Sequence, residues 1–170
     1  MNKLLQVVLT IFLSIFAVQV KPAEIPQRIK TLDAEFNKEL KCLAKNVYFE
    51  ARGEPFAGKV AVAQVSLNRT NSGRYPDTIC EVVSQKAKVA DKTVCQFSWY
   101  CTNKRFSNVS AMDYKKSYNA AWQVLVDGYR LRPLKNALYY HSTSVNPQWR
   151  LTKVAKIGNH IFYKEKPQKG

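Results

Sequence analysis

Hydrophobic side chains recur at helical spacing over residues 33–52. They follow one another at intervals of three, four and seven residues, which is the pattern of an amphipathic helix. These positions are Leu40, Leu43, Ala44, Val47, Tyr48 and Ala51. Asp33 can cap the start of such a helix, and Gly53 can end it in a left-handed turn. The pattern predicts a helix from about Asp33 to Arg52, preceded by a polar linker over residues 24–34.

The next segment, residues 55–69, is apolar on nearly every side. Pro55 can open a helix, and it biases Glu54 away from helical angles. A helix of this kind belongs in the middle of a core. Gln64 and Asn68 are polar exceptions four residues apart on one face, and buried amides need hydrogen-bond partners. They either brace the core or line a binding site, and the pattern leaves both alternatives open.

Weaker patterns follow in the middle of the chain. Residues 77–86 indicate a short helical segment, and an irregular stretch extends from there to about Asn108. A third helix is predicted from Ser110 to Gly128, because Asp113 can complete a capping box with Ser110. Its expected buried face consists of Tyr114, Tyr118, Ala121 and Leu125.

The C-terminal part of the chain changes to the pattern of β-strands. One strand is expected over residues 137–141, and residues 151–157 and 160–163 indicate a hairpin. The Gly158-Asn159 pair between the last two strands is typical of a tight turn. These elements predict an α+β domain over residues 35–165, predominantly helical with a small C-terminal antiparallel sheet.

The first 23 residues have the composition of a targeting segment. Lys3 is followed by an apolar run over residues 4–20, longer than a usual signal-peptide core and just long enough for a membrane span. We expect a cleaved signal peptide, although no clean cleavage site is present. An uncleaved anchor is the alternative, and it would give a transient association with the membrane. Both predict an exported protein, in the periplasm, the cell envelope or the extracellular space.

Export changes the interpretation of the four cysteines, because thiols outside the cytoplasm form disulfides. Cys95 and Cys101 can close a short loop, which leaves Cys42 to pair with Cys80. A zinc site would need closely spaced cysteine and histidine ligands. The sequence lacks that spacing, so we expect neither a metal nor another cofactor.

The chain of 170 residues has the length of one ordinary domain, and its formal net charge is +15. A basic exported protein is attracted to anionic surfaces, and cell envelopes carry carboxylates and phosphates. A solvated basic face that only maintains solubility is the alternative. Nucleic acid is not an expected partner, because an exported chain rarely meets it.

Glu50 is the candidate for acid catalysis. It follows Val47 by three residues and Leu43 by seven, so it lies on or beside the apolar stripe of the first helix. It also lies in the last turn before Gly53, where the helix dipole is negative. Burial and a negative dipole both favour the neutral carboxylic acid. Such an acid can protonate a glycosidic oxygen.

Several segments of the sequence resemble a known family. They are LAKNVYFEARGE over residues 43–54, VAVAQVSLNR over 60–69, CQFSW over 95–99, ALYYH over 137–141, NPQW over 146–149 and IGNHIFY over 157–163. Together they resemble the SleB/CwlJ type of cell-wall hydrolases, which cleave peptidoglycan. The resemblance covers about residues 40–163, and it implies a lysozyme-like fold. We also expect the protein to be a monomer.

The resemblance also implies residue roles. Glu50 would be the single catalytic acid of a lytic transglycosylase or muramidase, acting in wall remodelling or phage lysis. Apart from the resemblance, the flanking Gly53 and Pro55 indicate that the helix does not continue through Glu54, so Glu54 is interpreted as structural, either as a helix-start cap or as a partner for Arg52. The expected contacts to the glycan are made by Gln64, Asn68, Gln96, Ser98, Trp99 and Tyr140. Trp99 is equally compatible with a place in the core.

Two other functions remain open from the sequence. A peptidoglycan amidase or peptidase would need a zinc site or a cysteine nucleophile. A non-catalytic cationic protein would bind the wall without releasing fragments. His141 and His160 are interpreted as structural histidines, because no carboxylate cluster accompanies them in the sequence.

Overall fold

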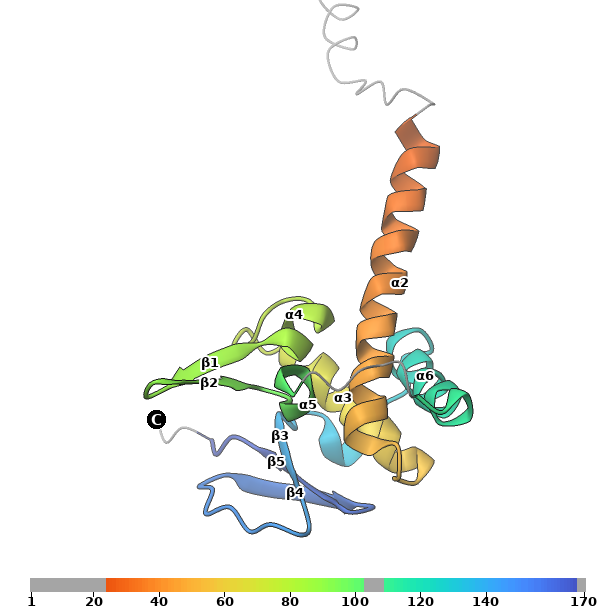
Figure 1. Ribbon diagram of the computed structural model, residues 1–170. Coiled ribbons are helices and arrows are strands. Elements are labelled where there is room, and N and C mark those ends of the chain that lie inside the picture. The colour runs from red at the N-terminus through yellow and green to blue at the C-terminus, as the bar shows by residue number, and fades with distance from the viewer. Residues whose placement is uncertain (1–23, 103–108, 168–170) are drawn as a thin grey trace, which may run out of the picture. The chain divides into compact units, whose positions relative to one another are not determined.

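The computed structural model describes residues 24–102 and 109–167 (Figure 1). The chain divides into two compact units at Glu35 and Phe36, and helix α2 (Glu24–Ala51) continues through this boundary. The described part of the first unit is residues 24–35 of that helix. The predicted targeting segment, residues 1–23, lies outside the described residues. Within the described ranges, no helix has the length and apolar character that a membrane span requires.

The predicted start of the first helix at Asp33 is wrong, because α2 begins at Glu24 and the expected linker over residues 24–34 is helical. Position 26, a proline, lies in the first turn of α2, where backbone N–H groups have no partner within the helix, so a residue without an N–H costs no hydrogen bond there. The predicted C-terminal end is nearly correct, since α2 ends at Ala51 rather than Arg52.

The helical core lies in the second unit, where it is built around α3 (Phe56–Thr70). Pro55, the predicted first residue of this helix, stands at the N-cap position, one residue before α3 begins. Helix α3 packs against α4 (Ile79–Ser84) and α6 (Ala111–Leu125). Its central residues are fully buried, as the nearly all-apolar sequence predicted. They pack with Leu40, Leu43, Ala44, Val47, Val82, Phe97 and Val124.

Helix α6 is rotated relative to the prediction. The side chains of Tyr114, Tyr118 and Leu125 are only half-buried at the edge of the core, whereas the fully buried positions are Ser117, Ala120, Ala121 and Val124. Small side chains allow α6 to approach α3 closely. The bulky aromatic rings therefore lie beside the contact instead of within it.

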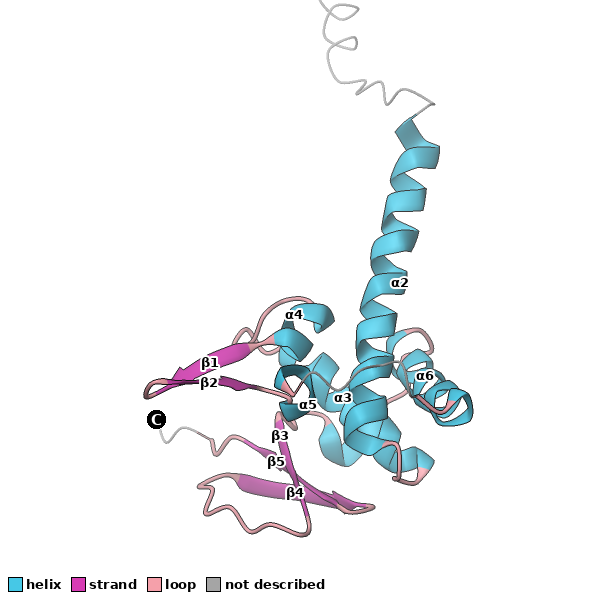
Figure 2. Cartoon of the chain, viewed as in Figure 1, coloured by secondary structure: helices cyan, strands magenta, loops and turns pink. Residues whose placement is uncertain are grey.

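The C-terminal sheet has the strand order β3-β5-β4 and is antiparallel throughout. Its strands are β3 (Tyr139–Ser142), β4 (Thr152–Ile157) and β5 (His160–Lys164). Figure 2 shows this sheet as a separate layer from the helices. Gly158 has a φ of 58° in the β4–β5 turn, a left-handed angle that favours glycine. The predicted hairpin is therefore confirmed.

A second, two-stranded sheet was missed by the sequence analysis, which expected irregular structure there. Strands β1 (Lys86–Val89) and β2 (Lys92–Cys95) form an antiparallel hairpin. Every strand residue of this hairpin except Cys95 is exposed. The sequence therefore lacks the alternation of apolar and polar residues that marks a half-buried strand. A short helix, α5 (Ser98–Cys101), follows directly.

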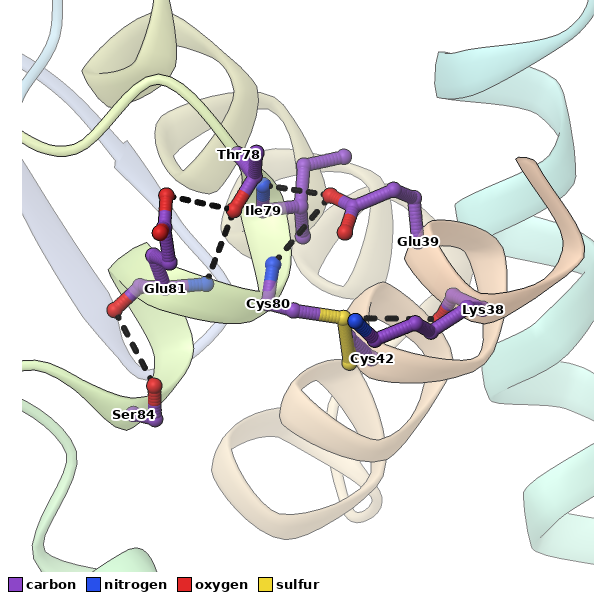
Figure 3. Close-up of a disulfide and its surroundings, with 8 residues drawn as sticks. All are labelled: Lys38, Glu39, Cys42, Thr78, Ile79, Cys80, Glu81 and Ser84. Carbon is purple, nitrogen blue, oxygen red and sulfur yellow. Dashed lines mark hydrogen bonds between the residues drawn. A yellow bond between two sulfur atoms is a disulfide. The ribbon is translucent and has the colours of Figure 1, made fainter. Parts of the chain in front are cut away.

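Two disulfides connect these elements: Cys42 to Cys80, and Cys95 to Cys101. The first joins α2 to α4 (Figure 3). Beside it, the carboxylate of Glu39 accepts hydrogen bonds from the backbone N–H groups of Ile79 and Cys80, at 2.6 and 3.2 Å. The start of α4 is thus held by a covalent bond and by a charge-assisted cap.

The two disulfides should contribute unequally to stability. Their partners are separated by 38 and 6 residues, and in the chain-entropy account the longer loop constrains the unfolded chain more. We expect paired Cys→Ser replacement to cost roughly 4 kcal/mol for Cys42–Cys80 and roughly 2 kcal/mol for Cys95–Cys101. Urea unfolding of the two double variants would measure this difference, and equal losses would contradict it.

Candidate active site

One side of α2 carries the polar residues that contact the rest of the second unit. Glu39, Cys42, Asn46 and Glu50 follow at intervals of three, four and four residues, so they lie along one face of the helix. This face flanks the apolar stripe of the same helix. Glu50, at its C-terminal end, is half-buried, in agreement with its predicted place beside the stripe.

Glu50 is contacted from the sheet by Tyr140. The Tyr140 hydroxyl donates a hydrogen bond to Oε2 of Glu50 at 3.1 Å. Desolvation raises the pKa of Tyr140 well above its usual value, and the negative charge of Glu50 raises it further. The phenol therefore stays protonated and remains a donor. On the same strand, Tyr139 donates instead to Glu165, as expected for side chains that alternate across a strand.

A buried arginine lies behind this pair. Arg69 is only 3% exposed, and its Nε donates to the carbonyl oxygen of Leu138 at 2.8 Å. The guanidinium lies over the rings of Tyr75 and Phe97, at 5.0 and 5.2 Å from their centroids. Burial lowers the pKa of Arg69, and nearby tyrosines and Glu50 oppose that effect. Arg69 therefore places a positive charge in the field of Glu50.

Asn46 fixes the aromatic side of the site. Its Oδ1 accepts a hydrogen bond from Nε1 of Trp99, and its Nδ2 donates to Oγ of Ser66, both at 3.0 Å. The Trp99 ring stacks on Phe49, with centroids 4.5 Å apart and planes 18° from parallel. The sequence analysis missed Asn46, although a polar residue beside an apolar stripe was a usable signal.

Glu54 is locked into the β4–β5 turn. Its carboxylate accepts hydrogen bonds from the backbone N and from Nδ2 of Asn159, at 2.8 and 3.2 Å. A Cβ atom at Gly158 would collide with Oε2 of Glu54, and the left-handed angle of this residue also favours glycine. The structural interpretation of Glu54 fits these contacts, but both predicted roles are wrong. No side chain caps α3 at its start, and no ion pair joins Glu54 to Arg52 among the described residues.

His160 fills the space between Glu54 and Tyr140. Its ring meets the Tyr140 ring edge-on, with centroids 5.2 Å apart, and its Nδ1 lies 4.0 Å from Oε1 of Glu54. Burial lowers the pKa of His160, against the opposing effect of Glu54. His141 lies elsewhere in the sheet, where its Nε2 is 2.8 Å from the Tyr163 hydroxyl. Both histidines therefore have packing partners in the sheet.

Gln64 and Asn68 brace the segment between α6 and β3. Gln64 exchanges hydrogen bonds with the backbone of Leu131, through Oε1 at 2.7 Å and Nε2 at 3.2 Å. Nδ2 of Asn68 donates to the carbonyl oxygens of Leu134 and Ala137. Of the two roles that the sequence left open, these contacts fit the bracing of the core. The amide groups that were expected to bind a glycan are hydrogen-bonded to the backbone instead.

The remaining predicted contacts lie at the start of α5. Gln96 and Ser98 are exposed. With the amide group of Gln96 turned so that its oxygen faces a donor, Oε1 accepts hydrogen bonds from Nη1 and Nη2 of Arg69 at 3.2 and 3.3 Å. Over the described ranges, no three His, Cys, Asp or Glu side chains gather closely enough to hold a metal ion.

Comparison with known proteins agrees with this architecture. A family model described as Cell Wall Hydrolase matches residues 53–163, more than half of the chain. The spore cortex-lytic enzyme of Bacillus subtilis (strain 168) is 32% identical over 129 residues, which are 74% of this chain and 37% of the relative. That of Oceanobacillus iheyensis is 33% identical over 132 residues, 74% and 41% of the two chains. The chain thus spans less than half the length of these curated relatives.

Two solved structures are similar to the model. The catalytic domain of the Bacillus cereus SleB protein has a TM-score of 0.56 at 30% identity, covering 75% of this chain and 91% of its own. The corresponding domain from Bacillus anthracis, described as a germination-specific lytic transglycosylase, has the same TM-score and identity, with coverages of 74% and 93%. The fold is therefore the lysozyme-like α+β fold of SleB catalytic domains.

The protein belongs to the cell wall hydrolase family. The predicted family resemblance is confirmed. The match begins at Gly53, so Glu50 lies three residues before it, while Arg69, Trp99 and Tyr140 lie within it.

The contact between Gly158 and Glu54 can be measured. We expect Gly158→Ala to lower the free energy of unfolding by roughly 2 kcal/mol, because the new methyl group displaces a hydrogen-bonded carboxylate and the angle is left-handed. Added to Glu54→Ala, the same change should cost less, since the displaced group is gone. A double-mutant cycle by urea unfolding would test this coupling, and strictly additive losses would disprove it.

His160 should make stability depend on pH. The unfolded chain binds a proton at the ordinary histidine pKa of 6.5, whereas the buried ring resists it. Unfolding therefore takes up a proton below about pH 6.5, and stability falls with falling pH by at most about 1.4 kcal/mol per pH unit. His160→Gln should remove that slope. His141→Gln, at the chain's other histidine, is the matched control and should keep it.

Proposed function

We propose that this protein cleaves the glycan strands of peptidoglycan, with Glu50 as its catalytic acid. The hydrogen bond from Tyr140 to Glu50 is the observation that carries the proposal. It joins the acid on α2 to the sheet and fixes the carboxyl group by a neutral donor. Family membership and the similarity to SleB catalytic domains support peptidoglycan as the substrate class.

A single carboxyl group is sufficient for this chemistry. Glu50 donates its proton to the glycosidic oxygen as the bond from that oxygen to C1 of muramic acid breaks. The resulting Glu50 carboxylate then takes the proton of the C6 hydroxyl of the same muramic acid. The C6 oxygen bonds to C1 at the same time, and the product is an anhydro sugar. Arg69 supports the ionised state of Glu50 between the two proton transfers, because the positive charge of Arg69 and the negative charge of Glu50 stabilise each other.

The state of Glu54 favours the mechanism with one carboxylate. Two-carboxylate glycosidases need a second group that reaches the sugar or activates a water. Glu54 is the nearest carboxylate in sequence, and its oxygens accept two hydrogen bonds from Asn159. Turning it toward a substrate would break both. We therefore favour lytic transglycosylation over hydrolysis.

Trp99, Gln96 and Ser98 complete the proposed site on the side of α5. Aromatic rings stack on sugar faces, and Trp99 is held in one orientation by Asn46 and Phe49. We also propose that the protein acts outside the cytoplasm as a monomer, in wall remodelling or in phage lysis. The two disulfides support the extracytoplasmic location.

Glu50→Gln tests the proposal. The variant keeps the shape of the side chain but has no proton to transfer, so the release of soluble fragments from sacculi should fall at least about 1000-fold. Glu81→Gln, at an exposed position in the first turn of α4, is the matched control and should digest normally. Mass spectrometry of the products separates anhydro ends, lighter by one water, from reducing ends. Normal digestion by the Glu50 variant would remove this residue from the chemistry.

A further inference from the structure

A basic pocket lies between α3 and the segment that follows α6. Its volume is about 540 Å³, and it is lined by Gln64, Asn68, Arg130, Leu131, Arg132 and Lys135. Three of these side chains are cationic and none is acidic. Glu50 is not among the lining residues, so the pocket is distinct from the contacts that surround the proposed acid.

Among the residues that the structure describes, the three cations have no carboxylate partners. In the described ranges, no ion pair involves Arg130, Arg132 or Lys135. Arg130 is held in place, because its Nη1 donates to the carbonyl oxygens of Val124 and Tyr129. Like charges gathered around one pocket repel one another, and an anionic ligand would relieve that repulsion.

A second pocket continues the first. It has a volume of about 280 Å³, shares Asn68 and Lys135 with its neighbour, and is also lined by Asn71, Ser72, Asn136 and Leu138. Asn71 and Asn136 are exposed. Each carboxamide offers both a donor and an acceptor, the same pair that a peptide group offers. A basic pocket joined to an amide-lined one fits a short peptide that carries carboxylates better than a bare phosphate.

We propose that these joined pockets bind the carboxylate-bearing stem peptide of peptidoglycan. The inference rests on the proposed function, and it adds a peptide contact to the glycan contacts near Glu50. Arg132 and Lys135 would pair with peptide carboxylates, and Asn71 and Asn136 with peptide groups. Gln64 and Asn68 serve this site by holding the segment that carries the cations.

The proposal is tested by isothermal titration calorimetry, in which a free stem tetrapeptide is titrated into the full chain. The charge-reversed double variant Arg132→Glu/Lys135→Glu should weaken binding by about tenfold or more. Lys115→Glu/Lys153→Glu changes the net charge equally at exposed positions outside the pocket, and it should bind within about twofold of the unmodified protein. A tetrapeptide whose carboxyl groups are all amidated lacks the charges that Arg132 and Lys135 would pair with. It should therefore bind the unmodified protein as weakly as the free tetrapeptide, called the acidic peptide below, binds the Arg132→Glu/Lys135→Glu variant, called the pocket variant.

Three results would overturn the proposal. They are no binding of the acidic peptide, equal weakening by the two double variants, and equal binding of the amidated peptide. Thermal unfolding of the pocket variant shows whether its fold is intact; if it is not, the comparison of acidic with amidated peptide on the unmodified protein decides. Because the peptide has no glycosidic bond, Glu50→Gln should bind it normally. Failure at this site is therefore distinguishable from failure of the proposed catalysis.

Discussion

The polar face of α2 holds the second unit together around the proposed acid. Glu39 and Cys42 hold the start of α4, Asn46 binds Ser66 of α3 and Trp99 of α5, and Glu50 accepts a hydrogen bond from β3. Because one rigid helix carries all four residues, the position of each segment relative to Glu50 is fixed by a helical interval rather than by a loop.

These contacts are polar, and several are buried, which makes their completeness important. A buried polar group without a partner costs more than a hydrogen bond contributes. Asn46 is fully buried, and the structure gives its amide two side-chain partners. Arg69 is balanced differently, by one backbone carbonyl, the amide oxygen of Gln96, two aromatic rings and the field of Glu50. Loss of any one partner would leave a desolvated group, so the network favours a single arrangement of the site.

The sequence was informative where local periodicity determines structure. The helices α3 and α6, the β4–β5 hairpin and the position of Glu50 beside the apolar stripe all follow from patterns within about twenty residues. The partners of Glu54 and Gln64 do not. They lie 105 and 67 residues away, and both contacts involve backbone groups, which no residue pattern identifies. The β1–β2 hairpin was missed for another reason. A strand pair that is exposed on both faces has no alternation of buried and solvated residues, so the sequence carries no signal for it.

The C-terminal end of α2 and the start of α3 are joined to the sheet at two places, with different consequences. Tyr140 contacts Glu50, and Asn159 contacts Glu54, which follows Gly53. His160, packed against Tyr140 and near Glu54, connects the two. The Glu54 contact is made to the backbone of a tight turn, so it fixes where the sheet lies. The Tyr140 contact is then set by the pairing of β3 with β5, since Tyr140 is opposite Phe162 in the register. A displacement of the turn would therefore move the phenol away from the acid, even though the turn takes no direct part in the proposed reaction.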